Sequence, residues 1–369
     1  MLLDRRNVLQ WMAAASAAAC QSKREGGKLG TSVIETVALD GMQWPTPDPF
    51  LFCVHHDDAY PAGNGLQGPR ESLAGHPLGS DFAGPPGKLG GWRMYHGRQV
   101  PGFPQHPHRG FETVTVVRRG LLDHSDSLGA RARYGARDVQ WLTAGRGILH
   151  AEMFPLVDRS HPNPVELFQI WLNLPRVDKL VPPRFAMLWD RTIPHHVIRD
   201  DDGRTTWFEV MAGSISGNRA PDPPPSSWAA RATSEVAIWS IGMSSHARWT
   251  LPAASSGLSR WLYVFAGGIG IDGTPIANAV AKLRSDEEAV IQSGEEYVEM
   301  LLLQGRPIGE PVVRQGPFVM TTREEIRDTI VEYQDTQFGG WRWTSDEPVH
   351  PATEGRFAQH ADGRIERPT

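Results

Sequence analysis

Residues 103–115 read FPQHPHRGFETVT and carry two histidines, His106 and His108, at positions i and i+2. A run rich in β-favouring residues follows from Glu112 to Val117, which is typical of a β-strand. Because side chains two positions apart on an extended segment point to the same side, the two imidazoles can converge on one ligand. The stretch therefore predicts a β-rich fold whose strands carry metal-binding side chains.

A second stretch repeats this spacing. Residues 138–153 read DVQWLTAGRGILHAEM, in which His150 and Glu152 are again two positions apart. Two such strands can offer three imidazoles and one carboxylate to a single ion. Nitrogen and oxygen donors of this kind suit Fe, Mn, Ni, Cu or Zn, and the lack of thiolates argues against a closed structural zinc site. We therefore predict a metal site with positions left open for a substrate or oxygen.

Residue spacing alone does not decide which glutamate is the carboxylate ligand. Glu112 competes with Glu152, because Glu112 has the same strand parity as His106 and His108. His124 lies among turn-forming residues, and we expect it beside the site or at the surface.

Several further side chains are open to two interpretations. The pairs His55-His56 and His195-His196 could line a pocket, but solvated turns are the simpler interpretation. Three residues could either line the metal site or pack in the core, namely Phe103, Arg109 and Trp141.

Composition points to the same fold class. The chain has 369 residues and is 40% hydrophobic, enough for one large core or two modest ones. Glycine (38) and proline (30) together make up about 18% of it, against roughly 12% in average proteins, so many turns and short strands are expected. Spaced β-rich runs favour barrels or sandwiches, and they lie at Glu112–Val117, Val139–Thr143, Leu167–Leu174, Val236–Ile241, Arg260–Phe265, Glu288–Ile291 and Tyr297–Gln304.

One helix is predicted near the C-terminus. Thr322 and Glu325 form a capping box, an apolar face follows, and Gly339-Gly340 is expected to stop the helix. The tryptophan-rich tail beyond it is expected to wrap the core. Residues 33–95, by contrast, read as a largely irregular connection.

The N-terminus resembles an export signal. Residues 1–20 read MLLDRRNVLQWMAAASAAAC, with paired arginines, an apolar stretch too short to span a membrane, and small residues before Cys20. This layout resembles a twin-arginine signal with a lipoprotein box, so export and a lipid anchor on Cys20 are expected, with a polar tether over 21–32. If that interpretation is wrong, the protein is cytoplasmic. The one other cysteine, Cys53, is expected to be a buried, inert thiol.

Other function classes receive little support. A net charge of −5 and a pI near 6.3 show no excess of positive charge that could bind a phosphate backbone, so nucleic acid is not expected as a partner. The GxGxxG pattern at 268–273 is followed by Thr274-Pro275 rather than by a helix, which favours a hairpin turn over a dinucleotide site.

The two histidine-bearing stretches closely resemble the motifs of the pirin family of bicupins. The resemblance continues through residues 167–175 and 307–320 and covers most of residues 90–340. It implies two antiparallel β-barrel cupin domains of jelly-roll type, the first over 33–185 with the metal and the second over 186–320 without it. A helix and tail over 321–369 would follow. Only three of the 14 histidines lie beyond residue 200, so the distribution of histidines also places metal chemistry in the first half.

The resemblance also implies a ligand set and an activity. It assigns His106, His108, His150 and Glu152 as metal ligands, with Fe(II) as the expected metal. Several pirins are quercetin 2,3-dioxygenases, so it implies a flavonol-like aromatic substrate, O2, and Glu152 as the base that accepts the substrate's hydroxyl proton. A monomer is expected.

Two alternatives stay open, because ligand type alone does not establish catalysis or choose the ion. One is a non-catalytic iron protein that senses redox state or binds a protein partner. The other is isomerisation or hydrolysis on a metal without redox chemistry.

Overall fold

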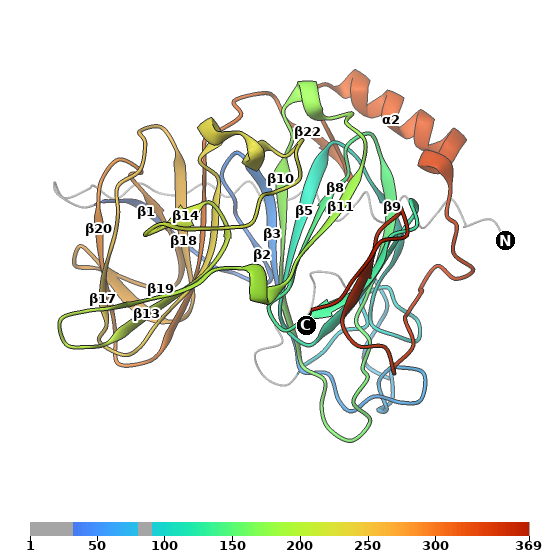
Figure 1. Ribbon diagram of the computed structural model, residues 1–369, viewed down its shortest axis with the longest axis horizontal. Helices are drawn as coiled ribbons and strands as arrows, with labels where there is room; N and C mark the ends of the chain where they lie inside the picture. Colours follow the sequence, from blue (N-terminus) through green and yellow to red (C-terminus); the bar gives the residue numbers. More distant parts are fainter. Residues whose placement is uncertain (1–31, 80–90, 369) are drawn as a thin grey trace.

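The computed structural model describes residues 32–79 and 91–368, which form two antiparallel β-barrels side by side (Figure 1). This confirms the predicted all-β class. The predicted N-terminal signal, including Cys20, lies outside the described residues. In the described ranges, no helix is both long and apolar enough to cross a membrane.

The first barrel consists of two six-stranded sheets that face each other across one apolar core. One sheet has the strand order β11-β8-β5-β10-β3-β2, with bounds β2 Gln43–Trp44, β3 Phe50–Asp58, β5 Phe111–Arg119, β8 Val139–Thr143, β10 Val165–Asn173 and β11 Arg184–Leu188. The other has the order β25-β24-β7-β6-β9-β4, with bounds β4 Gly102–His108, β6 Leu121–Asp126, β7 Arg131–Gly135, β9 Ile148–Met153, β24 Phe357–Gln359 and β25 Ile365–Glu366.

The second barrel is one nine-stranded sheet that closes around its own core. Its main path is β1-β19-β18-β21-β16-β13-β12, and β17 and β20 extend it beside β18. The strands are β1 Val33–Ala38, β12 His195–Arg199, β13 Thr205–Ala212, β16 Ala237–Met243, β17 Arg248–Leu251, β18 Ser259–Ile271, β19 Thr274–Leu283, β20 Ala289–Ser293 and β21 Val298–Gly305.

Short elements complete the described part. Two small hairpins are β14 Ser214–Ile215 with β15 Asn218–Arg219, and β22 Val313–Gln315 with β23 Phe318–Met320. Single-turn 3-10 helices occur at η2 Arg176–Asp178, η3 Asp190–Thr192, η4 Trp228–Ala230, η5 Ala232–Ser234 and η6 Gln337–Gly339.

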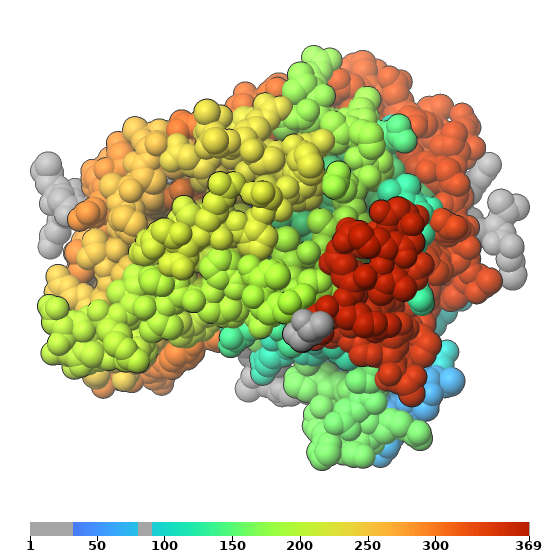
Figure 2. Space-filling view, in the orientation of Figure 1, coloured from blue at the N-terminus to red at the C-terminus, as the bar shows by residue number. Residues whose placement is uncertain are grey.

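The ends of the chain cross between the barrels. Strand β1 pairs with β19 of the second barrel, although the strands that follow it belong to the first. At the other end, β24 pairs with β7 of the first barrel. Figure 2 shows the red tail lying over the face of the first barrel, so the tail does wrap that domain.

A third apolar cluster joins the barrels. It contains outward-facing residues of the first barrel, such as Val114 and Trp141, and residues of the second, such as Tyr263 and Leu301. Because strand residues alternate between faces, β5 sends Thr113 and Thr115 inward while its even-numbered neighbours pack against the other barrel.

A buried ion cluster lies at the same junction. Arg118 of the first barrel is ion-paired with Glu166 beside it and with Glu299 of the second barrel. Glu166 also accepts from Arg119 and is 3.0 Å from His55 Nε2. Burial acts to raise the pKa of Glu166, but His55 and the two arginines outweigh it and lower that pKa to about 2.

The predicted C-terminal helix is confirmed as α2 Arg323–Thr336, and both halves of the Thr322–Glu325 capping box are present. The helix ends before Gly339-Gly340, because Gln337 and Phe338 already have positive φ. Phe338 contacts Phe318 and Tyr333, and this packing explains the earlier stop.

The expectation of an irregular segment over 33–95 is wrong for its first half, because β1, β2 and β3 lie there. Three strands form there rather than a single connection, and the proline- and glycine-rich stretch that suggested a connection begins only at Pro61, after β3. Cys53 is buried in β3, and burial raises the pKa of its thiol, as expected for an inert residue. The glycine pattern at 268–273 is a hairpin, in which Asp272 and Gly273 take positive φ between β18 and β19.

Candidate metal centre

Neighbouring strands β4 and β9 bring the three predicted histidines together. The two strands run antiparallel, with His106 directly opposite His150, and His108 follows two positions along β4. The chain then turns sharply at Gly110, whose φ is +86° and where a Cβ would meet the Val319 carbonyl at 2.0 Å. Only glycine fits this turn, which ends β4 and starts β5 in the opposite sheet.

The three imidazoles form a compact group. One donor atom from each of His106, His108 and His150 can be chosen so that all lie within 4.8 Å of one another, and the ring centroids are 4.4 to 4.8 Å apart. All three residues are buried. Within the described residues, this is the one group of three or more histidine, cysteine or acidic side chains with such geometry.

The donor set fits a divalent metal ion. Both ring nitrogens of His108 and of His150 are buried without a hydrogen-bond partner, which is costly unless another group binds them. Burial, together with the neighbouring imidazoles, lowers the pKa of His108 and of His150 well below the usual value. Both rings are therefore neutral, and this is the form that binds metals.

Glu152 lies beside the histidine group. Its Oε2 is 3.8 Å from Nε2 of His150 and accepts a 2.7 Å hydrogen bond from Nε2 of Gln169, while Thr115 donates to its Oε1 at 3.4 Å. Burial raises the pKa of Glu152, and the hydrogen-bond donors oppose that rise. The carboxylate is thus held by two side chains of the opposite sheet and faces the imidazoles.

Glu112, the rival carboxylate, lies elsewhere. Its side chain points out of the barrel, where it accepts hydrogen bonds from Ser227 at 2.5 Å and Thr143 at 2.7 Å. The parity argument fails because the turn at Gly110 separates β4 from β5, so a count from His108 does not continue into the next strand.

Of the other side chains singled out from the sequence, some lie close to the three histidines and some do not. His124 is fully buried opposite Glu152, with its ring centroid 5.5 Å from that of His150, so it lies beside the site and not at the surface. Phe103 lies 6.4 Å from His106, ring to ring. Trp141, in contrast, points into the cluster between the barrels.

Arg109 contacts helix α2 rather than the histidine group. Its guanidinium forms a 2.7 Å ion pair with Glu332 of α2, donates to Thr329, and lies over the ring of Phe338. It therefore ties α2 to the end of β4.

The prediction of solvated turns at both histidine pairs needs correction. His55 and His56 lie in β3, and His56 is buried, with its Nδ1 2.8 Å from the hydroxyl of Tyr95. The second pair opens β12, where His195 is exposed and pairs with Asp190. The sequence around His55 did signal a strand, through the apolar run from Phe50 to Val54.

A hairpin from the end of the second half lies next to the histidines. Phe318 of β23 forms a bridge with Arg109, the residue after His108. In the same hairpin, the guanidinium carbon of Arg314 lies 4.7 Å from the ring centroid of Trp171, and this ring is 5.3 Å from the His108 ring. Arg314 could not be predicted as part of this region, since nothing in its local sequence marks it as close to residue 108.

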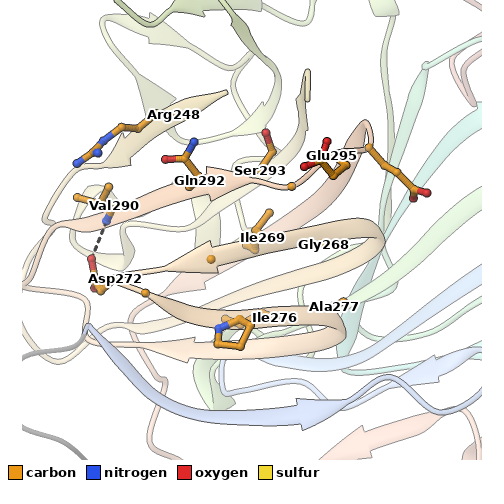
Figure 3. Close-up of a pocket in the computed structure, with 15 residues that line it drawn as sticks. Arg248, Gly268, Ile269, Asp272, Ile276, Ala277, Val290, Gln292, Ser293 and Glu295 are labelled. Atoms are coloured by element: carbon orange, nitrogen blue, oxygen red, sulfur yellow. Dashed lines mark hydrogen bonds between the residues drawn. The ribbon is translucent and has the colours of Figure 1, made fainter. Parts of the chain in front are cut away.

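The second barrel has a separate hollow of about 1140 Å³ on its sheet, lined by β17 to β20 (Figure 3). Gly268 and Gly270 are among its lining residues, and Asp272 accepts a hydrogen bond from the Val290 amide. Its lining residues contribute no histidine or cysteine, and it is built from a different sheet than the metal centre.

Fold and site together define the chain as a bicupin with a three-histidine candidate metal centre in its first barrel. Comparison with known families agrees. The Pirin model matches residues 88–172, and the model of the pirin C-terminal cupin domain matches residues 238–339. The chain belongs to the pirin family.

Relatives and solved structures give the same result. A Pseudomonas aeruginosa protein provisionally named quercetin 2,3-dioxygenase is 36% identical over 244 residues, which is 65% of this chain and 80% of that protein. Pirin of Rattus norvegicus is 31% identical over 255 residues, covering 66% of this chain and 80% of its own. The crystal structure of a quercetin 2,3-dioxygenase from Acinetobacter baumannii has a TM-score of 0.65 at 24% identity, covering 85% of this chain and 99% of that one, and supports the fold.

Proposed function

We propose that this protein is a metal-dependent dioxygenase of the quercetin 2,3-dioxygenase type, acting on flavonol-like or related aromatic enediols. The observation that carries the proposal is the buried group of three imidazoles with the Glu152 carboxylate beside it. The names of the relatives support the same reaction class.

His106, His108 and His150 would hold the metal, and Glu152 would be the fourth ligand. We propose Fe(II), and the donor set also suits Mn, Ni, Cu or Zn. When bound, Fe(II) would act as a Lewis acid on a substrate oxygen and would supply the redox chemistry that O2 requires.

The chain's own residues orient the substrate and move its proton. The carboxylate of Glu152, whose Oε2 lies 3.8 Å from Nε2 of His150, accepts the hydroxyl proton of the substrate. Gln169 and Thr115 fix the direction of that carboxylate. Phe103 and Trp171 add apolar ring surface next to His106 and His108, which suits a flat aromatic substrate and excludes water.

Oxygen uptake tests the proposal. The full chain is loaded with iron under argon, then mixed with quercetin and oxygenated buffer, and the metal-free chain serves as control. Uptake that depends on iron and matches quercetin loss supports the dioxygenase. No uptake with one iron bound per chain contradicts it and favours the non-catalytic metal-binding alternative.

For the rest of the chain, we propose export by the twin-arginine route and a lipid anchor at Cys20. The support is the sequence of residues 1–20 alone. Membrane contact would then be made only through the anchor, and a monomer is proposed.

A further inference from the structure

We propose that Arg314 selects the substrate of this site by binding a carboxylate on a flat aromatic molecule. The inference rests on the proposed function and adds a substrate class to it. Arg314 lies beside the ring that borders the histidines, has no counter-charge among the described residues, and has unpartnered polar atoms near it.

Arg314 lies against the ring that borders the histidines. Its guanidinium carbon is 4.7 Å from the centroid of the Trp171 ring and 5.2 Å from that of Phe52. Trp171 in turn makes an edge contact with His108 at 5.3 Å. One aromatic ring therefore separates Arg314 from a proposed metal ligand, a distance that a single aromatic substrate can span.

Arg314 has no acidic partner among the described residues. Its one hydrogen bond to protein is a long one of 3.5 Å from Nε to the Gly316 carbonyl, and burial alone lowers its pKa, with no carboxylate opposing the shift. Two other arginines of the first barrel differ. Arg109 pairs with Glu332, and Arg118 pairs with Glu166 and Glu299. A half-buried guanidinium without a counter-charge is unfavourable, and an anionic ligand would remove that cost.

A guanidinium suits a carboxylate. Its N–H groups form a planar fork that can donate two parallel hydrogen bonds, and this geometry matches a carboxylate. Lysine can supply the charge but not the planar pair of donors.

Two further polar atoms lie nearby without partners. Trp171 Nε1 and Thr113 Oγ1 are buried and make no hydrogen bond. These residues stand directly opposite each other on β10 and β5, and the Trp171 side chain belongs to the barrel core. Unpaired donors next to an unpaired cation indicate a place built for an oxygen-rich ligand rather than for packing.

Binding of two matched probes tests the proposal without turnover. We would titrate iron-loaded full chain under argon with 3,4-dihydroxybenzoate and with 3,4-dihydroxytoluene, which share the vicinal hydroxyls and differ in the carboxylate. Calorimetry should show the carboxylate probe binding about tenfold tighter, equal to about 1.4 kcal/mol. Arg314→Gln should abolish that preference and leave the affinity for 3,4-dihydroxytoluene unchanged, while Arg314→Lys should retain part of it.

The control variant is Lys282→Gln, which removes a cation lying 4.7 Å from the Trp261 ring on the second barrel. It should keep the full preference. Circular dichroism and metal content verify that each variant is folded and loaded.

Two results would overturn the proposal: no preference in the wild type, or equal weakening of both probes by Arg314→Gln, which would mean that Arg314 only holds Trp171 in place. Failure of the dioxygenase is distinguishable, because it appears as absent oxygen uptake while the probe preference persists.

Discussion

The hydroxyl of Ser227 donates a 2.5 Å hydrogen bond to Oε2 of Glu112, a carboxyl group that is completely buried at the junction of the two barrels. Ser227 belongs to the connection between β15 and β16, after the chain has entered the second barrel, and its Oγ also accepts from the Ala229 amide to cap η4. A single hydroxyl thus fastens this connection to β5 of the first barrel.

Glu112 should make stability depend on pH. Burial, with a smaller effect from Asp178, raises its pKa to about 7, against the opposing hydrogen bonds from Ser227 and Thr143. A raised pKa means that the folded state keeps the proton longer, so stability is complete below about pH 4.5 and is lost as pH rises towards 7. Compared with Glu112→Gln, the wild type should lose about 2 kcal/mol of unfolding free energy between pH 5 and pH 8. Urea titrations at both pH values measure this. Parallel pH profiles for the two proteins would contradict it.

Glu166 should make stability depend on pH in the opposite direction, with stability lost as the pH falls. Its pKa is lowered to about 2, so its contribution is present above about pH 4.5 and is lost as pH falls towards 2. Glu166→Gln should cost about 3 kcal/mol at pH 7, because Arg118 loses its partner on the same barrel, and the difference from wild type should shrink below pH 3. Chemical unfolding at these pH values provides the measurement. A control is Asp222→Asn, which removes an exposed partner of Arg219 and should change stability by less than about 0.5 kcal/mol.

His106→Ala should abolish metal binding and leave the fold intact, because the ring is one of three donors and not part of the apolar core clusters. Metal content per chain after loading and desalting should fall from about one to near zero. His195→Ala, which changes an exposed histidine of the second barrel, should keep the metal. Retention of stoichiometric metal by His106→Ala would exclude the proposed site.

Thr322→Ala should destabilise the C-terminal helix. Thr322 accepts from the Glu325 amide at 3.1 Å, and loss of such a cap costs about 1 kcal/mol. Thr322→Ser retains the hydroxyl and should behave like the wild type. Amide hydrogen exchange in α2 reports the difference, and equal protection in the two variants would show that tertiary contacts alone hold the helix.

Replacing Arg5-Arg6 by Lys-Lys should block export if the N-terminus is a twin-arginine signal. Cys20→Ser should instead permit export and release the protein from the membrane. Cell fractionation with both variants tests the two halves of the interpretation separately, and normal membrane localisation of the Lys-Lys variant would refute the first half.

Local patterns predicted what depends on neighbouring residues. The i, i+2 spacing of His106 and His108 placed them on one face of a strand, and Thr322 with Glu325 located the helix start. A count of parity could not detect the turn at Gly110, so it left Glu112 as a rival ligand although that residue faces the other barrel.

Such local patterns cannot predict contacts between residues that lie far apart in the sequence. His56 reads as polar, yet it is buried because Tyr95, nearly forty residues on, supplies a hydrogen-bond partner. Arg314 and Trp171 are separated by most of the second barrel in sequence, and only the folded chain brings them together. The crossing of β1 and β24 between barrels is equally invisible to composition and periodicity.

This crossing has a consequence for biosynthesis. The first barrel receives strand β24 from residues 357–359, so a ribosome must translate nearly the whole message before the histidine-bearing half can be completed. A gene cut between the barrels would produce two halves that each lack a strand held by the other. The order in which the chain emerges therefore differs from the order in which its two domains can be finished.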